Sequence, residues 1–204
     1  MVVGYILSII IGYLLGSIPF GLVLTKMAGL GDIRQIGSGN IGATNVLRTG
    51  RKDLALLTLL CDIGKAAFAA YLCQWIFHSQ IIGVVAGVFA VFGHNYPVWL
   101  KFKGGKGVAS TLGLMFGVTP VVGVCTSLTW LLMAVLFRYS SLSALTALTL
   151  APIYAFFLEA DKRIGCVYFL LTILSFYRHR SNIVRLIHKE ETKIKFKNKS
   201  IEEK

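Results

Sequence analysis

The sequence predicts an all-α protein that crosses a membrane several times, and three observations point to this class. Of its 204 residues, 55% are hydrophobic and only 15% are charged, whereas a soluble domain carries roughly a quarter of charged residues. Apolar blocks recur along almost the whole chain, and each approaches the ~20 residues needed to span a bilayer as a helix. The basic residues stand between these blocks and at the C-terminal end, as in membrane proteins.

The excess of basic residues has a second interpretation that the pattern excludes. A formal net charge of +12 is typical of nucleic-acid-binding proteins as well as of membrane proteins. Here the charges are confined to short segments between apolar blocks and to the tail, instead of forming one basic face. We therefore expect membrane lipids, and no nucleic acid, as the surroundings of this chain.

We predict seven crossings. The segment 108–137 has thirty residues, about 45 Å as one helix, which is too long for an upright span. Pro120 lacks an N–H group and restricts Thr119, so the segment is expected to divide there into a short fourth helix and a full fifth. The predicted crossings are 2–24, 54–77, 81–98, the two parts of 108–137, 142–158 and 164–177.

The charges of the connecting segments predict the topology. The segments 25–52 and 101–106, Arg138 and the tail from Arg178 are basic, whereas the intervening turns are not. Alternating basic loops follow the positive-inside rule, so the N-terminus is expected outside and the C-terminus in the cytoplasm. We predict one integral-membrane domain, 1–188, and a tail of mixed charge, 189–204, that is a frayed helix or disordered near anionic lipid headgroups.

The first polar segment contains the sequence GSGNIGATN at positions 37–45, followed closely by Arg48. It satisfies G-x-G-x-x-G, but no βαβ unit surrounds it, so a dinucleotide fold is excluded. Glycines free backbone N–H groups to bind an anion, and an arginine provides a planar fork for phosphate. An ordinary glycine-rich loop is the alternative. The candidate anion-binding residues are Ser38, Gly39, Asn40, Thr44, Asn45 and Arg48.

A second constellation, 93–107, ends in Gly104-Gly105-Lys106-Gly107. It resembles the end of a P-loop, but Leu100 and Gly107 occupy positions that require glycine and Ser/Thr. Backbone donors and a lysine at the start of a helix still predict an oxyanion or phosphate site, with Lys106 as its charge. The neighbouring lysines at 101 and 103 are equally well explained as positive-inside charges.

Further polar residues are expected near these two loops. Ser141 begins the sixth crossing, and His179 and Asn182 follow the last one, so the predicted topology places them on the same membrane face. His179 could act as a base, as a hydrogen-bond donor or only as a basic residue at a helix end. Asp62 and Lys65 lie three residues apart inside the second crossing, where a structural ion pair and a functional pair are both possible.

The patterns that the sequence lacks reduce the number of reactions that the site could catalyse. No set of His, Asp or Glu residues has the spacing of metal ligands, and the loops contain no acidic doublet that would hold magnesium. We therefore predict neither metal nor cofactor. Cations and neutral donors gathered on one face indicate a site for one or two phosphates beside a lipid phase.

Three segments together resemble a known family. They are GSIPFG at 16–21, GSGNIGATNVLR at 37–48 and GHNYPVWLKFKGGKGVAS at 93–110. With the RHR-x-N element near the end, they are similar to the bacterial membrane glycerol-3-phosphate acyltransferases that use acyl phosphate. The resemblance implies transfer of a fatty acyl group to the 1-hydroxyl of sn-glycerol 3-phosphate, which gives lysophosphatidic acid and phosphate and begins phospholipid synthesis.

The resemblance also implies a location, partners and site residues. It implies a multi-pass protein of the bacterial inner membrane, with its active site on the cytoplasmic side and the soluble enzyme that makes acyl phosphate as an expected partner. Ser38, Arg48 and Lys106 are the expected catalytic residues. The other candidates of the two loops are expected to bind substrate: Gly39, Asn40, Thr44, Asn45, Gly104, Gly105 and Gly107. Ser141, His179 and Asn182 are expected near the glycerol 3-phosphate.

Two functions of other classes are the alternatives to this one. A transporter of a phosphorylated small anion would share the basic face, but it is expected to show internal repeats and a midplane site, and no repeat is evident. A phosphotransferase acting on a nucleotide-activated lipid requires paired metal-binding aspartates, which the sequence lacks.

Overall fold

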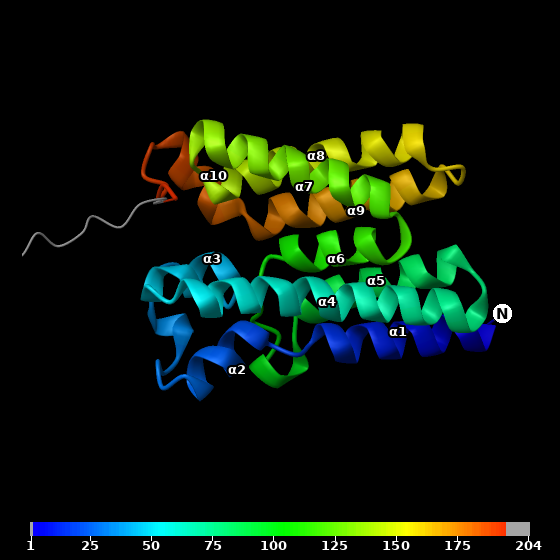
Figure 1. Ribbon diagram of the computed structural model, residues 1–204, viewed down its shortest axis with the longest axis horizontal. Coiled ribbons are helices and arrows are strands. Elements are labelled where there is room, and N and C mark those ends of the chain that lie inside the picture. The colour runs from blue at the N-terminus through cyan, green and yellow to red at the C-terminus, as the bar shows by residue number, and fades with distance from the viewer. Residues whose placement is uncertain (1, 195–204) are drawn as a thin grey trace, which may run out of the picture.

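A computed structural model describes residues 2–194, and every regular element in this range is a helix (Figure 1). The elements, in chain order, are α1 (Val2–Gly16), α2 (Phe20–Met27), η1 (Ile33–Gln35), α3 (Ala43–Val46), η2 (Leu47–Thr49), α4 (Lys52–Phe77), α5 (Gln80–Asn95), η3 (Val98–Leu100), α6 (Val108–Val118), α7 (Pro120–Phe137), α8 (Ser140–Leu158), α9 (Arg163–Arg178) and α10 (Arg180–Ile187).

The helical membrane fold predicted from composition is confirmed. Five segments of the described chain are long and apolar enough to cross a bilayer. Helices α6 and α9 have 11 and 16 residues and are not among them. The count of seven crossings and the orientation of the termini therefore stay predictions. The five segments are Val2–Met27, Lys52–Phe77, Gln80–Leu100, Pro120–Phe137 and Ser140–Leu158.

The division of 108–137 into two helices is also confirmed. Helix α6 ends at Val118 and α7 begins at Pro120, with Thr119 between them in a non-helical conformation (φ −138°, ψ 63°). Proline fits the first turn of α7, where its missing N–H costs nothing. The Thr119 hydroxyl shares a hydrogen bond with the phenol of Tyr168 on α9, 2.5 Å away, so the break is held from the neighbouring helix.

The predicted crossing over 2–24 corresponds to the apolar segment Val2–Met27, but it is not one continuous helix, because it breaks at Ser17-Ile18-Pro19 into α1 and α2. Pro19 cannot donate a backbone hydrogen bond, so a helix that contains it loses a bond in its interior. The carbonyl of Ile18 accepts instead from the ammonium of Lys65 on α4, at 2.8 Å. Hydropathy alone does not reveal this break, because the segment is apolar on both sides of it.

Glycines on α1 and α6 bring helix backbones into direct contact. A Cβ at Gly12 or Gly16 would lie 2.1 Å from a carbonyl oxygen of α5, and one at Gly113 would lie 2.1 Å from the carbonyl of Ile63 on α4. Such small residues permit close approach where lipid offers no hydrophobic driving force. Helix α5 packs against α1, α4 and α6.

The polar segments gather at one end of this bundle (Figure 1). The ends of α2 and α10 lie there with α3, whereas the N-terminus and the turns α4–α5 and α8–α9 lie at the opposite end. The two basic loops and the start of α8 thus come together as the charge pattern predicts.

The tail is more ordered than its composition predicts. Glu190 donates to the carbonyl of Arg185, and Ile194 donates to that of Arg138 between α7 and α8. The expectation of a frayed or disordered segment is therefore wrong for 189–194, because these residues have specific partners. The rest of the predicted tail, 195–204, lies outside the described residues, and the division of the chain at 188 stays a prediction.

Candidate functional site

A cavity of about 280 Å³ opens at the polar end, between the first loop and helices α4, α6, α7, α8 and α10. Its walls differ in character. The polar wall contains Ser38, Asn40, Thr44, Asn45, Arg48, Lys106, Ser140, Ser141, His179, Asn182 and Glu191, with Asp62 and His94. The apolar wall contains Leu59, Ile63, Val108, Ala109, Leu112, Trp130 and Ala144.

The first loop is organised around the buried amide of Asn45. The Asn45 side chain donates to the carbonyls of Ile33 and Ile36, both at 3.0 Å, and accepts from the backbone N–H of Ser38 at 3.0 Å. A Cβ at Gly37, whose φ is +57°, would lie 2.6 Å from the Asn45 oxygen. Asn45 fixes the loop and so positions Ser38 at the cavity. The predicted contact of Asn45 with substrate stays a prediction.

The same loop is joined to α8 and presents Arg48. The hydroxyls of Thr44 and Ser140 lie 3.1 Å apart, which connects two segments far apart in the sequence. Arg48 lines the cavity on an exposed face, and its charge contributes to a lower pKa of Lys106. The guanidinium is therefore available to an anionic ligand in the cavity.

The glycine loop (residues 104–107) uses part of its backbone for its own structure. The N–H groups of Gly104 and Gly105 donate to the carbonyls of Asn95 and His94, at 3.2 and 2.9 Å. Arg178 binds the two glycine carbonyls from the other side, at 2.6 to 3.0 Å. The expectation that these two amides bind an oxyanion is wrong, because their donors are already used.

Lys106 is the buried cation of this loop. Its ammonium donates to the side-chain oxygen of Asn182 on α10. Burial and the charges of Arg185, Arg48 and Arg178 together lower the pKa of Lys106 to about 8, against the opposing charge of Glu191. At neutral pH the ammonium is charged, and it lies beside the first turn of α6, whose N–H groups add positive potential.

His179 is neutral at physiological pH. Burial and the nearby charge of Lys106 lower its pKa to about 4. Its Nδ1 lies 2.8 Å from the carbonyl oxygen of Ser175. A carbonyl only accepts hydrogen bonds, so Nδ1 carries the proton and Nε2 is an acceptor. Because His179 lines the cavity, that acceptor is available to a ligand hydroxyl.

Glu191 completes the polar wall from the tail. Its carboxylate accepts from Ser141 at 3.0 Å, from Asn182 at 2.7 Å and from Arg185 at 2.7 Å. Burial alone would raise the pKa of Glu191, but these three hydrogen bonds outweigh it and hold the pKa below its usual value. The charged carboxylate orients two of the predicted substrate-binding side chains.

The structure brings most of the sequence candidates together. Nine of them line the cavity: Ser38, Asn40, Thr44, Asn45, Arg48, Lys106, Ser141, His179 and Asn182. Four glycines, Gly39, Gly104, Gly105 and Gly107, do not line it and serve the turns around it.

Sequence reasoning missed three residues of the site. Glu191 stands in a stretch of alternating Lys and Glu that looks like a solvated tail, and Arg178, which binds the glycine loop, looks like part of a basic helix end. His94 was noted within the second motif, but no signal assigned it a role.

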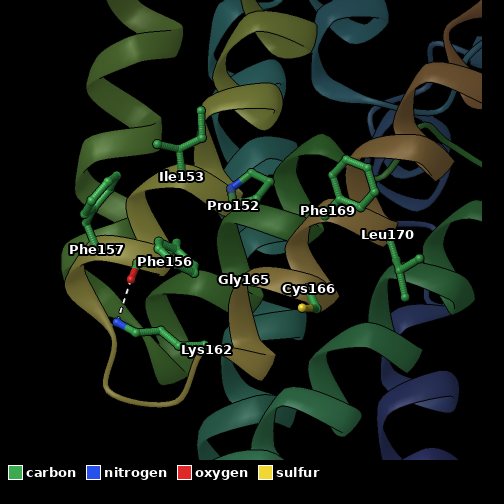
Figure 2. A pocket seen from close by; sticks show the side chains of 9 residues that line it. All are labelled: Pro152, Ile153, Phe156, Phe157, Lys162, Gly165, Cys166, Phe169 and Leu170. Atoms are coloured by element: carbon green, nitrogen blue, oxygen red, sulfur yellow. Dashed lines mark hydrogen bonds between the residues drawn. The ribbon is translucent and has the colours of Figure 1, made fainter.

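A larger groove of about 520 Å³ lies on α8 and α9 at the opposite end of the bundle (Figure 2). It is almost entirely apolar, lined by side chains such as Ile153, Phe157 and Leu170. Its one cation, Lys162, donates to the carbonyls of Phe156 and Glu159, at 2.6 and 2.8 Å. This groove therefore offers no polar chemistry.

The fold and the cavity define a multi-pass membrane protein with an anion-binding site at one end of its helices. Comparisons with known proteins give the family. Residues 6–189 match the family model described as glycerol-3-phosphate acyltransferase. The chain is 55% identical over 196 residues to the glycerol-3-phosphate acyltransferase of Rhodospirillum rubrum, covering 93% of this chain and 90% of the relative. It is 57% identical over 189 residues to that of Paramagnetospirillum magneticum, covering 93% of each.

Solved structures agree with these sequence relatives. The crystal structure of PlsY, an integral membrane glycerol 3-phosphate acyltransferase, in its glycerol 3-phosphate form superposes with a TM-score of 0.88. The two chains are 38% identical over 94% of this chain and 96% of the other. A lysophosphatidic acid form gives a TM-score of 0.85 at 37% identity, covering 93% and 94%. This chain belongs to the glycerol-3-phosphate acyltransferase family, and it is an acyltransferase.

Proposed function

We propose that this protein transfers a fatty acyl group from acyl phosphate to the 1-hydroxyl of sn-glycerol 3-phosphate, giving lysophosphatidic acid and inorganic phosphate. One observation carries the proposal. A single cavity joins two cations, Lys106 and Arg48, to an apolar wall that includes Leu59 and Trp130. Two phosphorylated substrates, one with an acyl chain, fit this pairing of polar and apolar walls.

The geometry supports direct transfer without an enzyme nucleophile. An acyl phosphate is a mixed anhydride that already has a good leaving group. The glycerol 3-phosphate hydroxyl attacks the acyl carbon, the carbon–oxygen bond to phosphate breaks, and phosphate leaves with its electron pair. Lys106, Arg48 and the hydroxyl of Ser38 neutralise the charge that develops on the phosphate and carbonyl oxygens.

The attacking hydroxyl must lose a proton, and the structure favours a substrate phosphate as its acceptor. A phosphate monoester has its second pKa near 6. The pKa of His179 is about 4, so this side chain is the weaker base. Its unprotonated Nε2 instead accepts a hydrogen bond from a substrate hydroxyl and aligns it, so His179 is a binding residue. Ser141 and Asn182, which Glu191 orients, have the same role.

The apolar wall supplies a place for the acyl chain. Leu59 and Ile63 come from α4, and Trp130 comes from α7. A chain held between these two helices reaches the bilayer sideways, while its phosphate stays at the polar end. Longer chains then extend into lipid and require no enclosed tunnel.

The location follows from the same arrangement. We infer that the polar end faces the cytoplasm of a bacterial inner membrane, because the basic loops lie there. Seven crossings, with α6 and α9 among them, give an outer N-terminus and an inner C-terminus. Soluble glycerol 3-phosphate enters from the cytoplasm, and a soluble enzyme that makes acyl phosphate is the expected partner.

The test is reconstitution with defined substrates. Purified protein in lipid nanodiscs receives a long-chain acyl phosphate and glycerol 3-phosphate, and lysophosphatidic acid and phosphate are quantified. Equal amounts of both products support the proposal, and the Lys106→Ala variant serves as the matched control. Product formation with acyl-CoA but not with acyl phosphate would refute the choice of donor.

A further inference from the structure

Three ionisable side chains that the proposed mechanism leaves unused meet next to the glycine loop. Asp62 and Lys65 project from α4, and His94 projects from the last turn of α5. Their side chains are 2%, 2% and 4% exposed. Charged groups at this depth are costly unless they are paired, and they are often functional. The ion pair expected from the sequence is present, and a histidine joins it.

Lys65 is the centre of the cluster, and its ammonium has three polar neighbours. Its ammonium lies 2.7 Å from an oxygen of Asp62, 2.8 Å from the carbonyl of Ile18 and 3.0 Å from Nδ1 of His94. The Ile18 carbonyl is accessible because the chain breaks at the following proline. The interruption between α1 and α2 therefore completes the coordination of this lysine.

These contacts favour one tautomer of His94. A lysine ammonium has three donors and no acceptor, so the imidazole Nδ1 that faces it must accept. Asp62 lies farther from Nδ1, at 3.4 Å, and its charge is already balanced by Lys65. A neutral imidazole whose Nδ1 accepts carries its proton on Nε2. His94 is thus a hydrogen-bond donor at its outer nitrogen.

That nitrogen faces the glycine loop and the cavity. A Cβ at Gly105 would lie 2.0 Å from Nε2 of His94, so this loop position must be glycine for the imidazole to fit. His94 lines the cavity of the candidate site. Among residues 2–194, its recorded contacts with side chains all use Nδ1, and Nε2 has no hydrogen-bond partner. A nearly buried donor without a partner therefore lies against the glycine loop, on a side chain that lines the anion-binding cavity.

We propose that the Nε2–H of His94 is a further donor to the phosphate of the acyl donor, and that Lys65 and Asp62 are positioning residues that fix its tautomer. This inference rests on the proposed function. The Gly104 and Gly105 amides are used by the carbonyls of α5, and His94 supplies a donor beside Lys106 in their place. It adds a hydrogen bond to the leaving phosphate without adding a charge, which is effective in a site that excludes water.

The tautomer can be measured without any turnover. Protein labelled with ¹⁵N-histidine in nanodiscs has four imidazoles, and the His94→Gln variant identifies the resonances of His94. Two-bond nitrogen–proton correlations distinguish the two neutral forms. The Nε2–H form in the free protein, with a resonance that shifts as inorganic phosphate is added, supports the proposal. The Nδ1–H form, or an Nε2–H resonance unaffected by saturating phosphate, overturns it.

Kinetics test the role of the donor. His94→Phe keeps the volume and loses both nitrogens, and its kcat should fall about 100-fold, as when one oxyanion donor is removed. His94→Gln retains a donor and should stay within about tenfold of wild type. His78→Phe, at an exposed turn far from the cavity, is the matched control. Wild-type kcat in His94→Phe would overturn the proposal.

A test of Asp62 and Lys65 as positioning residues requires a measurement that a purely structural role would not change. The double variant Asp62→Asn/Lys65→Met removes both charges, so neither is left buried and unpaired. It should lose the single Nε2–H form, and kcat should fall while KM for glycerol 3-phosphate changes little. An unaltered tautomer in this variant contradicts their assignment. If the wild type does not use acyl phosphate, the proposed function fails, but the tautomer and its response to phosphate still decide this inference.

Discussion

The ammonium of Lys106 donates a hydrogen bond to the side-chain oxygen of Asn182, which lies 76 positions later in the chain. The same amide donates from its nitrogen to Glu191 at 2.7 Å. A cation, an amide and a carboxylate thus form a continuous chain across the cavity. The lysine is positioned before any substrate arrives, which favours catalysis because little reorganisation is then needed.

The buried position of Lys106 predicts an alkaline limit to activity. Its pKa is about 8, and a lysine is charged below its pKa, so kcat/KM should fall as the pH rises through about 8. Bound anionic substrates favour the ammonium, so the limit in kcat should lie at higher pH. Lys106→Arg, whose guanidinium stays charged, should remove the limit from kcat/KM, measured between pH 6 and 10. An unchanged limit in this variant would assign the titration to another group.

The substrate-assisted route predicts a mild effect of His179→Gln. Glutamine can still accept a hydrogen bond from a substrate hydroxyl, so kcat at saturating substrates should stay well above that of Arg48→Ala or Lys106→Ala. Initial rates of lysophosphatidic acid formation give the comparison. A thousandfold loss of kcat with unchanged affinity for glycerol 3-phosphate is typical of a lost general base, and it would make His179 that base.

Cationic side chains of the protein neutralise the charge of the substrate phosphates, so the activity should persist when excess chelator removes metal ions. Lys106 and Arg48 line the cavity with the first turn of α6. The assay compares protein treated with EDTA against protein supplied with magnesium, at equal ionic strength because screening weakens charge interactions. Activity that is lost with the chelator and restored specifically by magnesium is the opposite result.

The topology can be tested with single cysteines in a background that lacks the four native ones. Lys101 follows η3 and Arg180 begins α10, and both are exposed. His78 and Ala160 are exposed in the turns α4–α5 and α8–α9, which lie at the end opposite to α10 (Figure 1). Each of the four residues is replaced by cysteine in turn. An impermeant maleimide added to intact cells should label only the second pair, and inverted vesicles should give the reverse. Labelling of Lys101→Cys in intact cells would contradict the cytoplasmic site.

Close helix packing predicts a stability effect at Gly16. The Cβ of Gly16→Ala would lie 2.1 Å from the Ala90 carbonyl, and overpacking of this kind costs about 1–3 kcal/mol. The melting temperature in detergent should fall. Gly64→Ala is the matched control, because it sits in α4 with nothing within 4 Å of the new Cβ. It should leave the melting temperature unchanged or raise it, since alanine favours helix.

The sequence predicts the helical membrane fold well, because hydropathy, proline and loop charge each act locally. The break at Thr119 and Pro120 is such a case. The break at Pro19 was missed, since a proline inside an apolar segment looks the same whether the helix kinks or stops. What decides it is a distant group, Lys65, that binds the carbonyl released there.

The site is predictable in part, for a related reason. Residue types that bind anions identify Ser38, Arg48 and Lys106 without knowledge of their neighbours. The roles of Gly104 and Gly105 depend on which hydrogen-bond partners are nearby, and those partners come from α5 and α9. Glu191 resembles any other charge of the tail until Asn182, Arg185 and Ser141 surround it.

The attachment of Glu191 has a consequence for the biogenesis of this protein. The cavity begins with Ser38 and is completed by a residue near the end of the described chain. During synthesis, the apolar helices can enter the membrane long before that residue leaves the ribosome. A chain that stops after α10 would still insert and keep Asn182, but without the carboxylate that orients Ser141 and Asn182 it would lack an assembled site.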